Sequence, residues 1–401
     1  RTADFHVIKA KAVILACGAA GRLGLPSSGY LMGTYENPTN AGDGYAMAYH
    51  AGAELANLEC FQINPLIKDY NGPACAYVTG PFGGYTSNNA GERFIECDYW
   101  SGQMMMEFFN ELEGGKGPVF LKLDHLAEET ISEIEHILHT NERPSRGRFH
   151  EGRGTDYRKA MIEMHISEIG FCSGHSASGI WTNERGECSI PGLYAAGDCA
   201  SIPHNYMLGA FVYGKFCGEN AADYVAGASD PRVDQDRVQI ERERVAAPLS
   251  RSEGPTPFQV EYKTRRVVND YLQPPKVTRK MEIGLQRFDE IREDLDHMVA
   301  EDPHELMRAM EAHTIRDCAE LAARASLFRT ESRWGLYHLC VDHPEKDDEN
   351  WFCHTNVTSD SNGNAKFRKR EVEPYVVELN DQEKVAYQRL RVASPATAKA
   401  A

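Results

Sequence analysis

The sequence lacks the features of a membrane-spanning chain, a metal-cluster protein and a nucleic-acid-binding protein. No apolar run approaches the roughly 18 residues that suggest a transmembrane helix. The 11 cysteines are scattered between Cys17 and Cys353 and include no Cys-x-x-Cys pair, so we expect no zinc site or iron–sulfur cluster within this chain. Lys and Arg number 43 against 59 Asp and Glu, and the net charge of −16 argues against a nucleic-acid partner.

A secretory signal is also missing, which predicts reduced thiols and a soluble, cytoplasmic protein instead of a disulfide framework. The 401 residues are enough for two or three domains, each with its own core. The chain starts at Arg1, and the segment from Phe5 to Ala16 has the pattern of a β-hairpin inside a fold. We therefore expect the natural N-terminus to lie before this sequence.

Two apolar strands end in glycine-rich turns. The run Gly192–Cys199 ends in Gly-Asp, a pattern by which many flavoproteins present a carboxylate to the ribityl chain of FAD. A second strand ends at Ala16 and leads into Cys17, Gly18 and Ala19, where small residues let the backbone approach a nucleotide. A plain structural turn is the alternative for this second segment.

Two histidine-containing segments flank the Gly-Asp strand and would surround an isoalloxazine ring. His175 is a candidate for substrate binding or proton transfer, because its pKa allows either protonation state near neutral pH. A buried structural histidine is the alternative. His204 could stabilise charge on reduced flavin or substrate, with a structural role equally open. It precedes a helix that we expect to start near Gly209 and to aim its positive end at the flavin.

The element pattern predicts an α/β fold: an FAD-binding Rossmann-like domain with its N-terminal part missing, an inserted α+β capping domain and a C-terminal helical domain. A basic stretch at 143–153 has the pattern of a loop, either solvated or suited to guiding an anion or docking a subunit. We expect an FAD-binding part at 1–53, the capping domain at 54–163, the FAD-binding return at 164–230, the helical domain at 255–345 and a mixed segment with a tail at 346–401.

Six motifs in order resemble the flavoprotein subunit of the succinate dehydrogenase and fumarate reductase family. Within that family, Phe171–Ser176 and Gly197–His204 are more similar to the α subunit of adenylylsulfate reductase. The resemblance implies bound FAD, a ferredoxin-like iron–sulfur subunit as partner and a hetero-oligomer. The motifs are Ala16–Arg22, Asn40–Gly44, Gly91–Phe94, Gly192–Asp198, Arg329–Gly335 and Asp347–Trp351.

The resemblance also assigns cofactor contacts. It implies that Asp43 and Asp198 accept hydrogen bonds from FAD, with a helix N-cap and an exposed turn as the respective alternatives. It places backbone contacts to the ring at Val212 and Tyr213, near the Gly209 helix start.

Departures from the family concern the substrate site. Asn64 stands where succinate-type enzymes have a substrate histidine, whereas Thr79 retains their threonine. The two family arginines that serve a dicarboxylate fall near Gly102 and on Met207. Because each guanidinium would compensate one carboxylate, we argue against C4-dicarboxylate chemistry. The obvious remaining cations are Arg22, Arg146, Arg148 and Arg153.

We therefore expect an FAD-dependent two-electron oxidoreductase similar to adenylylsulfate reductase. Its substrate would be a small anion, with a sulfur oxyanion or its nucleotide adduct among the candidates. One alternative is a succinate dehydrogenase or fumarate reductase with a rebuilt site. Another is a non-catalytic flavin scaffold in an electron-transfer complex.

Overall fold

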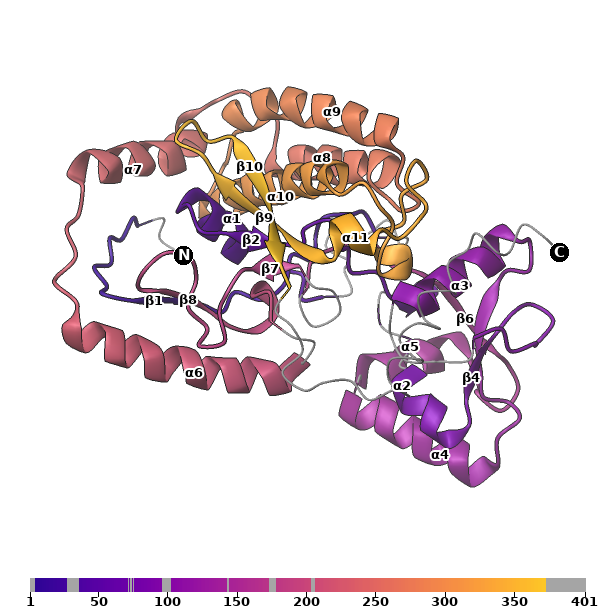
Figure 1. Cartoon of the computed structure of the whole chain (residues 1–401). Helices are drawn as coiled ribbons and strands as arrows, with labels where there is room; N and C mark the ends of the chain where they lie inside the picture. The colour runs from indigo at the N-terminus through magenta and orange to yellow at the C-terminus, as the bar shows by residue number, and fades with distance from the viewer. Residues whose placement is uncertain are drawn as a thin grey trace.

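The fold is known from a computed structural model. The chain forms a mixed α/β fold in which long C-terminal helices cover the central strands, and α6 (Tyr206–Gly227) lies on their other side (Figure 1). A further group of strands and helices, coloured purple, lies at one end. The structure describes residues 4–26, 36–70, 72, 74, 76–95, 102–142, 144–172, 178–202 and 206–372.

A parallel pair of strands carries the two glycine-rich turns. Strand β1 (Val13–Leu15) pairs with β8 (Leu193–Ala195), and Val13 lies opposite Leu193. The expected hairpin at 5–16 is wrong, because residues 4–12 contain no strand and the partner of β1 comes from the distant segment. The apolar residues of β1 therefore form a parallel pairing with a strand that is distant in the sequence.

The purple group in Figure 1 is built on an antiparallel sheet with the order β3-β6-β5-β4. Its expected helices at 103–112 and 126–138 are present, the second continuing as a π-helical stretch from Ile137 to Glu142. The expected loop at 143–153 is wrong from Pro144 onward, where α5 forms. The elements are β3 (Pro65–Ile67), α2 (Ala76–Thr79), β4 (Tyr85–Ser87), α3 (Gly102–Glu113), β5 (Val119–Lys122), α4 (Glu128–His136), α5 (Pro144–Arg153) and β6 (Ile162–Ile166).

A second antiparallel sheet has the order β10-β9-β2-β7. It combines two strands from the last 20 described residues with strands from much earlier in the chain. Leu55 in β2 pairs with both Ile180 and Val357, so segments about 300 residues apart share one sheet. The elements are α1 (Asp43–His50), β2 (Leu55–Ala56), β7 (Gly179–Ile180), α11 (Asp348–Trp351), β9 (Cys353–Ser359) and β10 (Ala365–Glu371).

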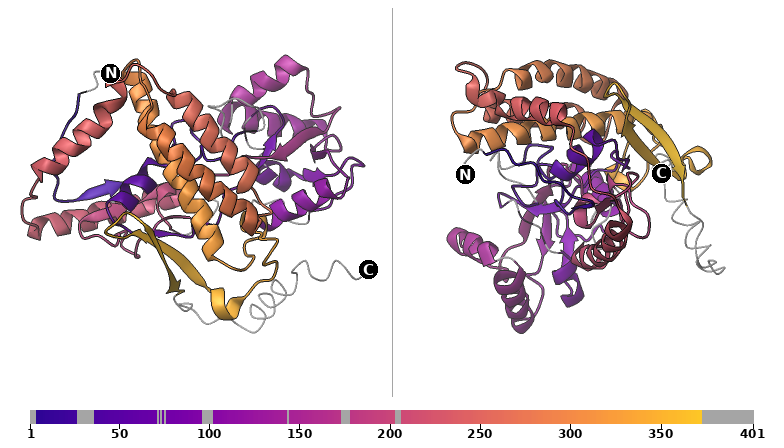
Figure 2. Two further views of the ribbon diagram at one scale, coloured as in Figure 1. Left: turned by 90° about the horizontal axis from the view of Figure 1, so that it is seen from above. Right: turned by 90° about the vertical axis from the view of Figure 1, so that its left-hand side faces the viewer.

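The C-terminal helices α8 (Pro257–Tyr271), α9 (Thr278–Asp296) and α10 (Pro303–Phe328) pack side by side (Figure 2). Local signals explain two of their starts. Thr256 and Gln259 form a capping box for α8, and the Asp302 carboxylate accepts hydrogen bonds from backbone amides at the start of α10. Helix α7 (Gln235–Ser250) precedes them.

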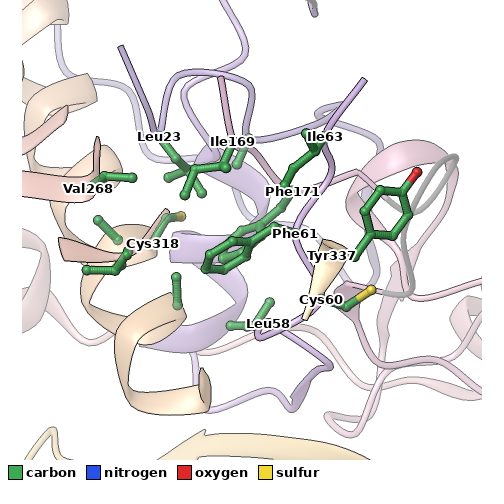
Figure 3. Packing of buried hydrophobic residues seen from close by; sticks show 14 of the residues in the cluster. Leu23, Leu58, Cys60, Phe61, Ile63, Ile169, Phe171, Val268, Cys318 and Tyr337 are labelled. Atoms are coloured by element: carbon green, nitrogen blue, oxygen red, sulfur yellow. The ribbon is translucent and has the colours of Figure 1, made fainter. Parts of the chain in front are cut away.

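Buried aromatic rings connect α1 with the segments that contain Phe61 and Phe171. The Phe171 ring lies 5.5 Å from the ring of Tyr45 in α1 and 6.3 Å from that of Phe61, measured between centroids (Figure 3). Each ring is fully buried. Burial of such a side chain contributes about 1.5–3 kcal/mol, so this contact fixes α1 against the strands beside the glycine-rich turns.

Candidate functional site

The two glycine-rich turns meet at one edge of the β1–β8 pair, because the carboxyl ends of parallel strands share an edge. Cys17 and Gly18 follow β1, and Asp198 follows β8 in a 3-10 turn (Gly197–Cys199). Cys17 is exposed here. The fold thus brings together two turns that lie about 180 residues apart in the chain.

Glycine is required in both turns. Gly18 has a φ of 76°, and a Cβ there would lie 2.9 Å from Nδ2 of Asn40. Gly197 has a φ of 71°, and a Cβ there would make an ordinary contact with Cβ of Ala210 at 3.7 Å, so its backbone conformation is what favours glycine. Ala19, in contrast, is fully buried and faces the core.

Asp198 and Asp43 lie on neighbouring elements at this edge. The Tyr45 hydroxyl in α1 donates a 2.9 Å hydrogen bond to the backbone oxygen of Asp198. Burial raises the pKa of the Asp198 carboxyl, while a hydrogen bond from the Cys172 thiol opposes this shift. Burial, followed by the nearby Glu311 carboxylate, raises the pKa of Asp43.

The N-cap alternative for Asp43 does not hold. The N-cap of α1 is Gly42, and Asp43 is the first helical residue, with its carboxylate 3.5 Å from the Thr314 hydroxyl. Its carboxylate therefore does not cap α1 and has the Thr314 hydroxyl as a hydrogen-bond donor.

Helix α6 offers an open apolar face. It begins at Tyr206, so the expected start near Gly209 is one turn too late. Met207 is 71% exposed and Val212 is 41% exposed, whereas Tyr213 is half-buried with its ring against Phe216. An exposed apolar helix face beside two carboxylates and two glycine turns fits a flat, hydroxyl-bearing cofactor such as FAD. His175 and His204 lie outside the described residues.

Asn64 is buried and keeps its side chain unpaired. Its backbone N–H donates to the Ser167 hydroxyl at 2.8 Å, but neither atom of its carboxamide has a hydrogen-bond partner among the described residues. Thr79, which ends α2, is also fully buried. An orphaned buried amide costs stability, and function is a common reason for keeping one.

Gly102 starts α3 where no side chain fits. A Cβ there would collide with the carbonyl oxygen of Trp334 and approach Cγ of Tyr337 to 3.2 Å. A side chain at this position, near which we expect the family's first arginine to fall, would therefore not fit. Met207, at the second arginine position, carries no charge.

The expected cationic role of Arg22 is wrong. Arg22 is fully buried, and its guanidinium donates to both oxygens of Glu261, at 3.0 and 2.5 Å, and to Glu311 at 2.7 Å. Arg265 and Arg308 bind the same Glu261. This buried network holds α8 and α10 against the first glycine-rich segment and leaves no charge for a substrate.

The basic stretch does not supply a substrate clamp either. Arg146 is buried and donates to the Tyr157 hydroxyl at 3.0 Å and to the backbone oxygen of Ala74 at 3.1 Å. Arg148 is exposed, and Arg153 forms an exposed ion pair with Asp69. Arg146 thus lies on the buried face of α5, together with His150.

Sequence reasoning missed a buried Lys276–His338 pair. The Lys276 ammonium nitrogen donates to the backbone oxygen of Glu59 at 2.6 Å and lies 3.0 Å from Nδ1 of His338. Burial lowers the pKa of Lys276 to about 7. The two residues are 62 positions apart and follow no motif spacing, so only the three-dimensional fold reveals the pair.

Residues 1–210 match the family described as FAD binding domain, and residues 262–386 match the fumarate reductase flavoprotein C-terminal domain. The chain belongs to the flavoprotein family of succinate dehydrogenases and fumarate reductases. This family of FAD-dependent oxidoreductases binds FAD, in agreement with the open edge of the β1–β8 pair.

Two curated members of this family illustrate the match. The chain is 26% identical to the succinate dehydrogenase flavoprotein subunit of Coxiella burnetii, over 93% of this chain and 66% of that protein. It is 27% identical to the fumarate reductase flavoprotein subunit of Mycobacterium tuberculosis, over 91% of this chain and 66% of that protein. The chain thus spans just under two thirds of the length of these relatives.

Solved structures share the fold. Adenylylsulfate reductase from Archaeoglobus fulgidus superposes with a TM-score of 0.83 at 24% identity, over 92% of this chain and 68% of that chain. The E. coli quinol fumarate reductase subunit superposes with a TM-score of 0.74 at 21% identity, over 92% and 67%. Among the described residues, no helix is both long and apolar enough to cross a membrane.

Proposed function

We propose that this protein is an FAD-dependent two-electron oxidoreductase acting on a small anion with a single charged head group, a sulfur oxyanion or its nucleotide adduct. The observation that carries this proposal is the lack of an available guanidinium at the two expected arginine positions and at Arg22: Gly102 admits no side chain, Met207 is neutral and Arg22 is bound to carboxylates. A dicarboxylate has two separated charges, which would be left uncompensated.

The residues of this chain would divide the work between cofactor and substrate. Asp198 would accept a hydrogen bond from a ribityl hydroxyl, and Asp43 would contact FAD beside it. The first amides of α6, helped by the helix dipole, would stabilise negative charge on the ring. FAD, when bound, supplies the electron-transfer chemistry.

For the substrate, neutral donors and two histidines would replace the family's arginine pair. The unpaired Asn64 carboxamide offers a donor and an acceptor. Thr79 retains the threonine that succinate-type enzymes have in their substrate site. His175 and His204 would supply positive charge near neutral pH. One or two imidazolium groups suit a compact oxyanion better than a molecule with charges at both ends.

We further propose that a ferredoxin-like iron–sulfur subunit exchanges electrons with this chain in a hetero-oligomer. The sequence contains no Cys-x-x-Cys pair, and its relatives from Coxiella and Mycobacterium are named as flavoprotein subunits. Because the sequence predicts reduced thiols, we also propose a cytoplasmic location. The division into five segments, with a capping domain at 54–163, is likewise a proposal.

Dye-linked turnover of the full-length FAD-loaded protein tests the substrate class. With ferricyanide as electron acceptor, we expect oxidation of sulfite, alone or with AMP, and none of succinate. Succinate turnover that malonate inhibits would instead support the fumarate reductase or succinate dehydrogenase alternative. Bound FAD that no small molecule reduces, yet that equilibrates with the partner's clusters, would support the scaffold alternative.

A further inference from the structure

The Tyr337 hydroxyl is a second buried polar group without a partner. Tyr337 ends a 3-10 turn (Gly335–Tyr337) and is 4% exposed, but its hydroxyl has no hydrogen-bond partner in the described part of the chain. In Figure 3, its oxygen points away from the Phe61–Phe171 ring pair. A buried hydroxyl that loses its hydrogen bond costs about 1–3 kcal/mol in stability. We therefore expect a bound ligand to accept the hydrogen bond of this hydroxyl.

The ring of Tyr337 lies where α3 begins. Its Cγ would be 3.2 Å from a Cβ on Gly102, so the tyrosine ring takes space that a side chain at position 102 would need. The preceding Trp334 adopts a left-handed conformation with a φ of 61°. Such a conformation at a non-glycine residue costs about 1–3 kcal/mol and is concentrated at functional sites.

The turn is fixed in this strained form by close backbone packing. Gly335 also has a positive φ, of 57°, and a Cβ there would collide with the Gly102 carbonyl oxygen. The backbone oxygen of Tyr337 accepts a 3.1 Å hydrogen bond from the Phe61 amide. The turn that carries the phenol is therefore packed against the start of α3 and hydrogen-bonded to the segment that contains Phe61.

Tyr337 is also connected to the cofactor edge. The Cys60 and Cys172 thiols are its electrostatic neighbours, and the Cys172 thiol donates a hydrogen bond to Asp198. Cys172 therefore lies near both the phenol and the carboxylate that we assign to FAD. Phe171, next to Cys172, exchanges backbone hydrogen bonds with Ala20 at the end of the first glycine-rich turn.

We propose that Tyr337 donates its phenolic hydrogen to an oxygen atom of the substrate and so takes the place of the missing arginine beside Gly102. This inference rests on the proposed function. Burial raises the pKa of Tyr337, so the phenol stays protonated throughout the physiological range and acts as a neutral donor. It can orient an oxyanion without compensating its charge, which agrees with a substrate that carries one charged group.

A sulfite titration of the full-length, FAD-loaded protein tests this inference. Sulfite is added anaerobically, and bleaching of the flavin absorption band gives its dissociation constant. In Tyr337→Phe, which keeps the ring and removes only the hydroxyl, we expect a tenfold or greater rise in this constant, unchanged FAD content and an unfolding temperature that is equal or higher. If the hydroxyl made a structural hydrogen bond, the variant would unfold at a lower temperature. If it contacts only the ligand, the unfolding temperature would not fall.

Tyr194→Phe is the matched control, because Tyr194 is equally buried but its hydroxyl donates to the backbone oxygen of Asn220 at 3.1 Å. We expect it to lower the unfolding temperature and leave sulfite binding unchanged. Equal sulfite affinity in Tyr337→Phe and wild type would overturn the role of Tyr337 alone. A wild-type protein that binds FAD but shows no bleaching by sulfite, either alone or with AMP, would overturn both this inference and the proposed function.

Discussion

At the scale of single residues, the chain keeps buried polar groups that its fold does not use. Asn64 is the clearest case, since both carboxamide atoms lack partners in the described structure. Asn64→Leu has a similar volume and should raise the free energy of unfolding by about 1–2 kcal/mol, because it removes an uncompensated amide. It should also weaken flavin bleaching by sulfite at least tenfold.

Urea unfolding and the sulfite titration measure these two effects, with Asn356→Leu as the control. Asn356 is equally buried, but its amide donates to Glu54 at 2.7 Å, away from the glycine-rich turns. That variant should lose stability and keep its sulfite response. A loss of stability in Asn64→Leu would show that the amide is structural.

Lys276 makes stability depend on pH. Burial lowers its pKa to about 7 from an ordinary 10.5, so between these values the unfolded chain holds more protons and stability rises with pH. Lys276→Met removes this titration. The unfolding free energy of the wild type minus that of the variant should therefore increase from pH 7 to 9, by at most about 1.4 kcal/mol per pH unit. A pH-independent difference in urea unfolding would contradict the lowered pKa.

At the scale of elements, the contact between α3 and the Trp334 turn leaves no space for a side chain at position 102. Gly102→Ala should lower the free energy of unfolding by about 2–3 kcal/mol, because its Cβ would collide with the Trp334 carbonyl. Gly218→Ala in α6 is the control, since nothing lies within 4 Å of its added Cβ and alanine favours a helix by about 1 kcal/mol. Thermal unfolding compares the two, and equal stability would refute the collision.

The docking of α8 and α10 depends on Glu261, which neutralises three arginines in a buried network. Glu261→Gln leaves uncompensated buried guanidinium charge and should destabilise the protein by about 3–5 kcal/mol. Asp294→Asn, which breaks the exposed pair with Lys263, should cost less than about 1 kcal/mol. Urea unfolding tests the contrast, and similar losses would mean that the network is not the main support of these helices.

The sequence allowed the elements with local signals to be predicted, together with the turns that carry family motifs. Helix α3 and the Gly-Asp turn are examples, because periodicity and small residues are visible within a short window. The pairing of β1 with β8 and the burial of Arg22 could not be predicted in this way, since their partners lie 180 or more residues away. Sequence also could not reveal that Tyr337 packs against Gly102.

At the scale of the whole molecule, the β1–β8 edge and α6 form the part that fits FAD. Gly102 lies in the purple group of Figure 1, Asn64 directly precedes its strand β3, and the turn that ends at Tyr337 packs against its helix α3. Substrate choice can therefore change without altering the cofactor edge. This arrangement explains how a chain with the family fold can lack both arginines that serve dicarboxylates.

The most direct test of the account is an anaerobic titration of the full-length, FAD-loaded protein with succinate and, separately, with sulfite with and without AMP. Flavin absorbance is followed in each titration. The account predicts bleaching by sulfite, alone or only when AMP is present, and no response to succinate. Bleaching by succinate would contradict it, because the protein would then bind a dicarboxylate without the two guanidinium groups that the argument requires.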